Sequence, residues 1–204
     1  MADPAARLVL ASGSPFRRKM LQDAGLVFDV AVAKIDERAL ENALKARGQA
    51  VGASEIAVAL AVAKAQAVSE QRPDALVIGC DQVLGFENEL ISKAEDVSAA
   101  RAQLRLLRGK THTLHSGIAL VERGEVVWKH VEIARMSMRP FSDAFLEDYL
   151  RAMGERVCQT VGGYEIEGRG IQLFERIEGD HFTIIGLPLL ALLGRLRDLG
   201  VVPA

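Results

Sequence analysis

Small hydroxyl residues and two arginines surround the start of a predicted helix near the N-terminus, in the segment ASGSPFRR over residues 11–18. Ser14 is a good N-cap, and Pro15 suits the first helical position. The unpaired N–H groups and the dipole of a helix N-terminus attract anions. We therefore expect Ser12, Ser14 and Arg17 to bind phosphate. A capped surface helix with solvated arginines is the alternative that this segment leaves open.

A carboxylate stands at the end of a buried-strand pattern in the middle of the chain. The apolar run Ala75–Cys80 predicts a strand that ends on Asp81 and Gln82. Ligands of open α/β sheets gather outside the carboxyl ends of strands. A carboxylate there can hold Mg²⁺ or accept a proton from an attacking water. Asp81 is a candidate for either role, and a strand-terminating turn residue is the alternative.

Further charged residues could hold an anionic ligand. Lys64 interrupts the apolar stretch Ile56–Ala67, so it either extends from a core-facing helix to solvent or points into a cleft. Lys93 lies in a predicted loop, and Asp36 and Glu37 follow a predicted strand. Position alone does not decide between a binding role and a solvated surface for these residues.

A glycine-rich segment lies in the last third of the chain. It has four glycines in the nine residues 162–170, which allows the backbone to approach a ligand closely. The segment matches neither a dinucleotide-binding fingerprint nor a Walker loop. Glu167 within it could accept hydrogen bonds from a base edge, or it could be a solvated turn acid.

The elements that must position these residues alternate between strand and helix patterns. They predict an α/β fold with a mixed, curved β-sheet flanked by helices. We expect one domain over residues 1–204, with two lobes around a central cleft. The predicted strands cover residues 7–11, 27–32, 75–80, 111–121, 126–138 and the end of 162–177, and the predicted helices begin at Ser14, Ser54, Asp96 or Ser98, Ser142 and Leu187.

Composition narrows the classes of function. The formal net charge is −2 over 204 residues, so there is no general positive field for nucleic acid or an anionic membrane. No apolar run approaches the ~20 residues that span a bilayer, and the N-terminus does not have the pattern of a signal peptide. Cys80 and Cys158 match no zinc motif and are expected to be free buried thiols. We expect a cytoplasmic enzyme or binding protein.

These pieces, in this order, resemble the Maf family of nucleoside triphosphate pyrophosphatases from about Leu8 to Val201. The resemblance implies hydrolysis between the α- and β-phosphates, which gives a nucleoside monophosphate and pyrophosphate. It also implies a divalent metal (Mg²⁺ or Mn²⁺), a fold related to the inosine triphosphate pyrophosphatases, and a homodimer. The matching segments are LASGSPFRRKML, IGCDQVL, VGGYEIEGRGIQLFERIEG and IIGLPL, with shorter matches at residues 35–37, 64–65 and 91–93.

The resemblance also assigns roles to individual residues. It places the proton acceptor on Asp81, and the carboxylates available to a metal on Asp81 and Glu37. The phosphate-binding positions that it implies are Ser12, Ser14, Arg17, Lys64 and Lys93.

Three further positions resemble the branch of the family that prefers 7-methyl-GTP. Phe16, Gln82 and Glu167 stand at the positions where that branch has an aromatic residue, Asp-Gln and Glu. A carboxylate such as Glu167 can accept the N1–H and N2–H of guanine, and an aromatic ring can face a cationic methylated base. We expect these three residues to determine substrate specificity.

Two other functions remain as alternatives. One is a dTTP/UTP pyrophosphatase, whose branch differs at the three specificity positions. The other is a nucleotide-binding regulator of cell division with little turnover, although the presence of Asp81, Glu37, Lys64 and Lys93 favours catalysis. RNA binding is the weakest reading, because aromatic and cationic residues are not interleaved on any predicted strand.

Overall fold

The structure is a computed structural model that describes residues 8–46 and 51–203. The chain forms two compact units. The first comprises Met1–Gln82, Ser116–Glu132 and His181–Ala204, and the second comprises Val83–His115 and Ile133–Asp180. Each unit is therefore assembled from separate segments of the chain. The predicted cleft between two lobes stays a prediction.

Parallel pairing organises the sheet of the first unit. Strand β1 (Leu8–Leu10) pairs in parallel with β2 (Asp29–Val30) on one side and with β3 (Leu76–Phe86) on the other. Strands β5 (Thr111–Glu122) and β6 (Glu125–Met138) follow in the order β2-β1-β3-β5-β6. Parallel strands require crossover connections, and the helices of this unit supply them.

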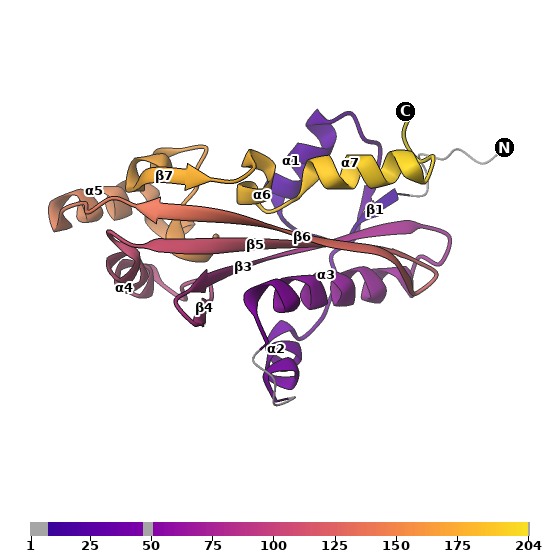
Figure 1. Cartoon of the computed structure of the whole chain (residues 1–204), viewed down its shortest axis with the longest axis horizontal. Helices are drawn as coiled ribbons and strands as arrows, with labels where there is room; N and C mark the ends of the chain where they lie inside the picture. The colour runs from indigo at the N-terminus through magenta and orange to yellow at the C-terminus, as the bar shows by residue number, and fades with distance from the viewer. Residues whose placement is uncertain (1–7, 47–50, 204) are drawn as a thin grey trace. The chain divides into compact units, whose positions relative to one another are not determined.

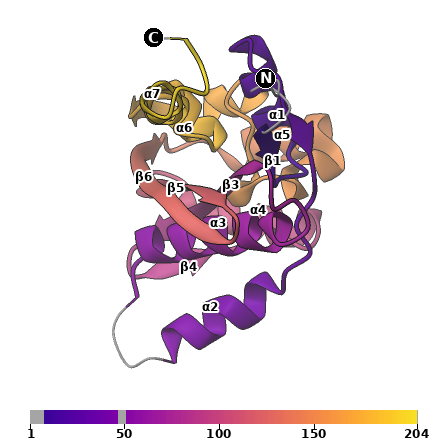
Figure 2. The same ribbon diagram turned by 90° about the vertical axis from the view of Figure 1, so that its right-hand side faces the viewer.

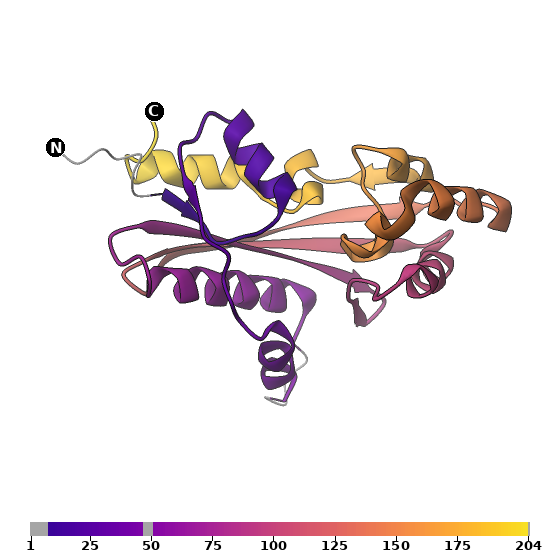
Figure 3. The same ribbon diagram turned by 180° about the vertical axis from the view of Figure 1, so that it is seen from behind.

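The helices of the first unit cover both faces of its sheet. Figure 1 shows α3 against one face and α1, α6 and α7 against the other. Figure 2 shows α2 on the far side of α3, which it contacts, and Figure 3 shows α1 beside α6, with which it is also in contact. The helices are α1 (Pro15–Asp23), α2 (Glu37–Lys45), α3 (Ala53–Ser69), α6 (His181–Ile185) and α7 (Leu189–Asp198).

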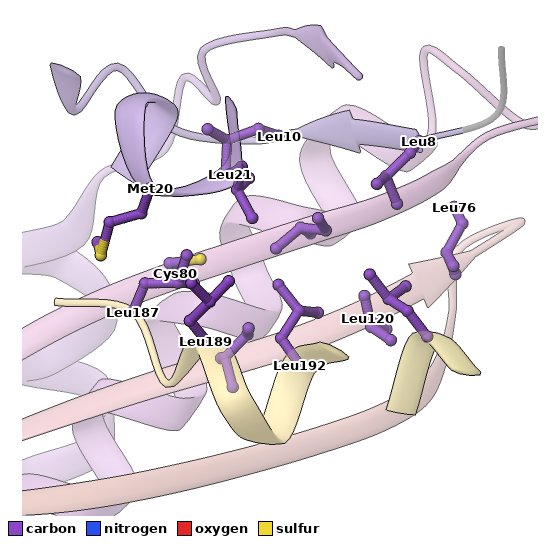
Figure 4. Close-up of a cluster of buried hydrophobic side chains, with 13 residues drawn as sticks. Leu8, Leu10, Met20, Leu21, Leu76, Cys80, Leu120, Leu187, Leu189 and Leu192 are labelled. Atoms are coloured by element: carbon purple, nitrogen blue, oxygen red, sulfur yellow. The ribbon is translucent and has the colours of Figure 1, made fainter. Parts of the chain in front are cut away.

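A leucine-rich cluster fills the space between the sheet and α1 and α7 (Figure 4). Alternate residues of β3 point into it, because successive side chains of a strand face opposite sides of the sheet. The apolar residues between them face α3, where Val77 packs with Ala65 and Val68. The cluster comprises Leu8, Leu10, Met20, Leu21, Leu76, Ile78, Cys80, Ile118, Leu120, Leu187, Leu189, Leu192 and Leu196.

Two glycines let α3 lie unusually close to the sheet. A Cβ atom on Gly79 would lie 2.0 Å from the carbonyl oxygen of Ala61 and 2.8 Å from the Cβ of Ala65. A Cβ atom on Gly117 would lie 2.4 Å from the backbone of Ala57. Only glycine on the strands and small residues on the helix permit this approach. The alanine-rich composition of α3 therefore has a packing reason.

The second unit contains residues 83–86 of β3, 111–115 of β5 and 133–138 of β6. Strand β4 (Glu89–Ile91) pairs antiparallel with Leu84–Phe86 of β3, and β7 (Phe174–Glu178) pairs antiparallel with the end of β6. Among its described residues are helices α4 (Val97–Leu107) and α5 (Asp143–Met153), and α5 is followed by the short 3₁₀ segments Gly154–Cys158, Val161–Gly163 and Arg169–Leu173.

Helix starts and the long hairpin agree with the sequence predictions. Ser14, Asp96 and Ser142 each accept a hydrogen bond from a first-turn backbone N–H as N-caps. The turn between β5 and β6 has positive φ at Arg123 (53°) and Gly124 (81°), which suits the twist of a two-residue hairpin. The mixed sheet flanked by helices is confirmed.

Strand lengths differ from the predictions in two places. The strand expected to end at Asp81 continues to Phe86, because its second half pairs with β4 and buries Val83, Leu84 and Phe86. The strand expected over residues 27–32 is only Asp29–Val30. The prediction that Asp81 ends a strand is therefore wrong, and Arg7 lies outside the described residues.

Two helix features also depart from expectation. Helix α2 was not predicted; Asp36 caps it by accepting a hydrogen bond from the N–H of Ala39 at 2.9 Å. The last helix begins at Leu189 and not at Leu187. Among the described residues, no helix is long and apolar enough to cross a membrane.

The close approach of α3 gives a stability prediction. Gly79→Ala should lower the free energy of unfolding by about 1–3 kcal/mol or more, because the new methyl group overlaps the α3 backbone. Gly194→Ala on α7 is the matched control: nothing lies within 4 Å of its added Cβ, so it should stabilise by about 0.4–1 kcal/mol. Urea unfolding of both variants measures this, and a Gly79→Ala protein as stable as the wild type would contradict it.

Candidate active site

Three consecutive residues of β3 serve both faces of the sheet in the first unit. The side chain of Cys80 enters the leucine-rich cluster, Asp81 faces α3, and Gln82 faces α6. This alternation follows from the pleat of a strand. It places a carboxylate and an amide side by side in sequence but on opposite faces of the sheet.

A lysine lies between two carboxylates on the α3 face. Lys64 Nζ lies 2.5 Å from Asp81 Oδ1 and 2.9 Å from Glu37 Oε1. The side chains of Lys64 and Asp81 are 13% and 11% exposed, whereas that of Glu37 is 52% exposed. Lys64 therefore points toward charged groups, and the close packing of α3 on Gly79 brings it there.

Opposing influences act on the Asp81 carboxyl. Burial raises its pKa above the ordinary value, and the Lys64 ammonium and the Arg17 guanidinium oppose that rise. A carboxylate held this way is a stronger base than a solvated aspartate, and it stays close to cations that stabilise its ionised form. These are the properties expected of a group that accepts a proton from water.

The thiol of Cys80, the residue before Asp81, is unreactive. Cys80 is fully buried, and burial raises its pKa to about 11. A neutral buried thiol acts as a small apolar group. Cys80 therefore contributes packing to the site, and the expectation of a free buried thiol is confirmed for this residue.

The loop between β1 and α1 gathers the predicted phosphate-binding residues. Ser12 is buried, and its Oγ accepts hydrogen bonds from the N–H of Ser14 at 3.2 Å and from Arg17 Nη1 at 3.3 Å. Arg17 Nη1 also donates to the carbonyl of Cys80 at 3.0 Å, and its Nε donates to the carbonyl of Gly186 at 2.8 Å. The guanidinium is thus fixed beside the residue that precedes Asp81.

The Gln82 amide is held against α6. Its Nε2 lies 3.0 Å from Ser116 Oγ, 3.1 Å from the carbonyl of Thr183 and 3.0 Å from that of Ile184. Sequence reasoning missed Ser116 and Thr183, which are fully buried polar residues. Their only signal in the sequence is a hydroxyl within an otherwise apolar run, which does not distinguish a site from a satisfied core group.

Lys93 and Glu167 belong to the second unit, and both are exposed. Lys93 follows β4. Glu167 lies in a turn that is closed by a hydrogen bond from the N–H of Gly168 to the carbonyl of Glu165 at 3.2 Å. The convergence predicted for Phe16, Gln82 and Glu167 stays a prediction.

The glycines of this segment serve its own folding. A Cβ atom on Gly170 would lie 2.5 Å from the carbonyl oxygen of Glu165, and one on Gly162 would lie 2.5 Å from the ring of Tyr164. Tyr164 is anchored in turn by His112, whose Nε2 lies 2.6 Å from the tyrosine hydroxyl. Close approach within the loop accounts for these glycines, and it holds Glu167 on a tight turn.

The carboxylates of the first unit have the chemistry to bind a divalent metal together with a phosphate. Asp81 and Glu37 both reach Lys64, and the described part of the chain has no group of three or more His, Cys, Asp or Glu side chains that could hold an ion. Mg²⁺ commonly uses one or two carboxylates, with phosphate oxygens and waters as its other ligands. The donor set fits such an ion.

Comparison with known proteins finds relatives over nearly the whole chain. The family model described as "Maf-like protein" matches residues 7–199. A 7-methyl-GTP pyrophosphatase of Rhizobium meliloti is 51% identical over 97% of this chain and 98% of that protein. A 7-methyl-GTP pyrophosphatase of Mesorhizobium japonicum is 50% identical over 96% and 98%, respectively.

A solved structure shares a distant likeness. The nucleoside-triphosphatase, or dITP/XTP pyrophosphatase, of Mycobacterium abscessus has a TM-score of 0.42 and 12% identity, covering 97% of this chain and 98% of that one.

The Lys64–Asp81 pair gives a prediction about stability and pH. Lys64→Met leaves the buried Asp81 carboxylate without its nearest cation, which should cost about 3–5 kcal/mol of folding free energy near neutral pH. The loss of the cation raises the folded-state pKa of Asp81 further. Stability should therefore be highest at acid pH and fall as pH rises through that pKa.

Urea unfolding of Lys64→Met at several pH values checks this expectation. The double variant Lys64→Met/Asp81→Asn removes the buried charge and should recover stability at neutral pH. Lys34→Met, at an exposed lysine, is the matched control. A loss in Lys64→Met that does not vary with pH would contradict the expectation.

Proposed function

The chain belongs to the Maf-like family, and from this premise we propose that it is a nucleoside triphosphate pyrophosphatase that prefers 7-methyl-GTP. The relatives named above support the activity and the substrate. The observation that carries the chemistry is the buried Asp81 carboxylate, held beside Lys64 and near Arg17. A pure binding protein has no need of a basic carboxylate at this place.

The reaction adds water across the bond between the α- and β-phosphates. Asp81 accepts a proton as the water oxygen bonds to phosphorus, the bridging P–O bond breaks, and the products are the nucleoside monophosphate and pyrophosphate. Burial keeps the pKa of Asp81 above its ordinary value, which favours proton acceptance. The carboxylate remains 11% exposed, so water can reach it.

Cations on the chain bind the phosphates in this proposal. The net charge of −2 means that attraction must come from locally placed groups. Arg17 and Lys64 lie near Asp81 in the first unit. Ser12 and Ser14 add hydroxyl and backbone donors at the start of α1. Lys93 of the second unit is proposed as a further phosphate ligand.

Glu37 and Asp81 would hold Mg²⁺ or Mn²⁺ together with phosphate oxygens. When bound, such an ion neutralises charge on the phosphates and helps to orient them. Glu37 is suited to this role because it is half-exposed at the N-terminus of α2, where Asp36 rather than Glu37 supplies the cap. Lys64 contacts both carboxylates, and in this proposal it binds the phosphates beside them.

The preference for 7-methyl-GTP is assigned to Phe16, Gln82 and Glu167. Glu167 accepts the N1–H and N2–H of the guanine edge, and Phe16, which is half-buried on α1, faces the methylated base. A cationic base over an aromatic ring gains about 0.5–2 kcal/mol. The proposal also includes a cytoplasmic homodimer, for which light scattering and cell fractionation are the direct measurements.

Asp81 and the metal can be tested by following pyrophosphate release. Asp81→Asn should lower kcat by roughly 10²-fold or more, as expected for loss of a general base. In the wild type, kcat/KM should fall as pH decreases, with its midpoint above the ordinary range of an aspartate because burial raises the pKa of Asp81. EDTA should abolish the activity and added Mg²⁺ should restore it.

Each part of this test can fail separately. Near-normal turnover by a folded Asp81→Asn protein would contradict the role of the carboxylate. Full activity in EDTA would contradict the metal alone. Asp74→Asn, at an exposed aspartate of the same unit, is the matched control for loss of a carboxylate and should leave kcat unchanged.

Substrate choice can be tested with a panel of nucleotides. We expect kcat/KM to be highest for 7-methyl-GTP among 7-methyl-GTP, GTP, dTTP and UTP. Glu167→Gln should reduce kcat/KM for the guanine nucleotides by about tenfold or more, because it replaces a charged acceptor of two hydrogen bonds. Glu175→Gln, at an exposed glutamate of the same unit, should leave the ranking unchanged.

The panel also separates the alternatives. A preference for dTTP or UTP would overturn the substrate and leave the pyrophosphatase reaction standing. Tight nucleotide binding without release of pyrophosphate would favour the regulator. An unchanged substrate preference in Glu167→Gln would show that Glu167 does not recognise the base.

A further inference from the structure

One buried residue of α6 is held by three neighbouring strands. The Thr183 carbonyl accepts hydrogen bonds from Gln82 Nε2 of β3 at 3.1 Å and from Ser116 Oγ of β5 at 2.7 Å. The Thr183 hydroxyl donates to Glu132 Oε2 of β6 at 2.5 Å. Side-chain anchors from β3, β5 and β6 therefore converge on a single residue of a five-residue helix.

These anchors are unusual for their setting. Thr183 and Ser116 are 0% exposed, and Phe182 and Ile185 of the same helix pack against the leucine-rich cluster. Apolar residues at such positions would fix α6 less specifically, because hydrophobic contacts are non-directional whereas buried hydrogen-bond networks define one arrangement. The network thus specifies the position of α6 on the sheet.

The hydrogen bonds at the C-terminal end of α6 fix the position of the Gly186 carbonyl. The N–H of Gly186 donates to the carbonyl of Thr183, and the N–H of Leu187 donates to that of Phe182, each at 3.0 Å. This is the Schellman pattern of a helix end, with Gly186 at φ +110° in a conformation that side chains disfavour. The peptide that carries the Gly186 carbonyl also carries the Leu187 N–H, so its orientation is set by the hydrogen bond to Phe182 at the end of the helix that Thr183 anchors.

That carbonyl is one of three groups that fix Arg17. Gly186 accepts from Arg17 Nε, and the Cys80 carbonyl and Ser12 Oγ accept from Nη1. Within the described residues, no hydrogen bond engages Nη2. The planar guanidinium is thus held at Nε and Nη1, and Nη2, which lies between them on its other side, has donors available to a phosphate.

We propose that Thr183 and Ser116 are positioning residues that orient the Arg17 guanidinium for phosphate through α6 and Gly186. This inference rests on the proposed function, because it assigns Arg17 to the phosphates of the substrate. Neither residue touches the substrate. Their effect is geometric: small displacements of a binding group away from the reacting atoms can reduce rates by large factors.

The test measures kcat and KM for pyrophosphate release in Thr183→Val, Ser116→Ala and a matched control. Ser69→Ala also removes a buried hydroxyl of the first unit, but Ser69 Oγ accepts a hydrogen bond from the N–H of Gly124 at the β5–β6 turn. We expect kcat/KM to fall by about tenfold in Thr183→Val and in Ser116→Ala. In Ser69→Ala it should not change.

A double-mutant cycle with Arg17→Ala separates positioning from general damage. If Thr183 acts through Arg17, then Thr183→Val should have no further effect on kcat/KM once Arg17 is absent. Thr183→Ser keeps the hydroxyl and should restore the activity that Thr183→Val loses. Equal losses in the presence and absence of Arg17, or no loss in either variant, would overturn the proposal.

The same proteins distinguish failure of this proposal from failure of the proposed function. If the wild type releases pyrophosphate from no nucleotide, the proposed function fails. The positioning role is then measured by calorimetry with inorganic tripolyphosphate, whose affinity should fall in Thr183→Val only when Arg17 is present. Absence of any Arg17-dependent binding of tripolyphosphate would overturn the positioning role as well.

Discussion

The contact of α3 with the sheet is the constraint on which the site depends. Glycines on β3 and β5 remove the side chains that would hold an ordinary helix at a distance, and alanines on α3 complete the fit. Lys64 is thereby brought close enough to contact Asp81. Interiors are packed too densely for such a contact to relax locally, so packing and electrostatics are inseparable in this unit.

The pleat of β3 divides the remaining work between two faces. Asp81 meets Lys64, which also contacts Glu37, on the α3 face, whereas Gln82 joins the hydroxyl network that holds α6 on the other. Arg17 links β3 to the end of α6, because its guanidinium donates to the backbone carbonyl of Cys80 as well as to that of Gly186. The adjacent residues Asp81 and Gln82 can thus serve proton transfer and the positioning of α6, respectively, without competing for space.

Local chemistry was readable from the sequence, and long-range pairing was not. Ser14, Asp96 and Ser142 were predictable because a cap uses atoms within a few residues. The continuation of β3 beyond Asp81 depends on pairing with β4. Helix α2 was not predicted because Asp36 and Glu37, its N-cap and first residue, were considered only as possible ligands. The approach of Lys64 to Asp81 and the role of Thr183 arise from segments far apart in the chain, and no spacing rule contains them.

The burial of Cys80 has a consequence for labelling chemistry. Thiol reagents attack the thiolate, and this thiol is both enclosed and held in its neutral form. Cys158, the second cysteine of the chain, is only partly buried in the other unit. The native sequence thus offers a single point for attaching a fluorophore or spin label, in the unit that does not contain Asp81, without any engineered cysteine.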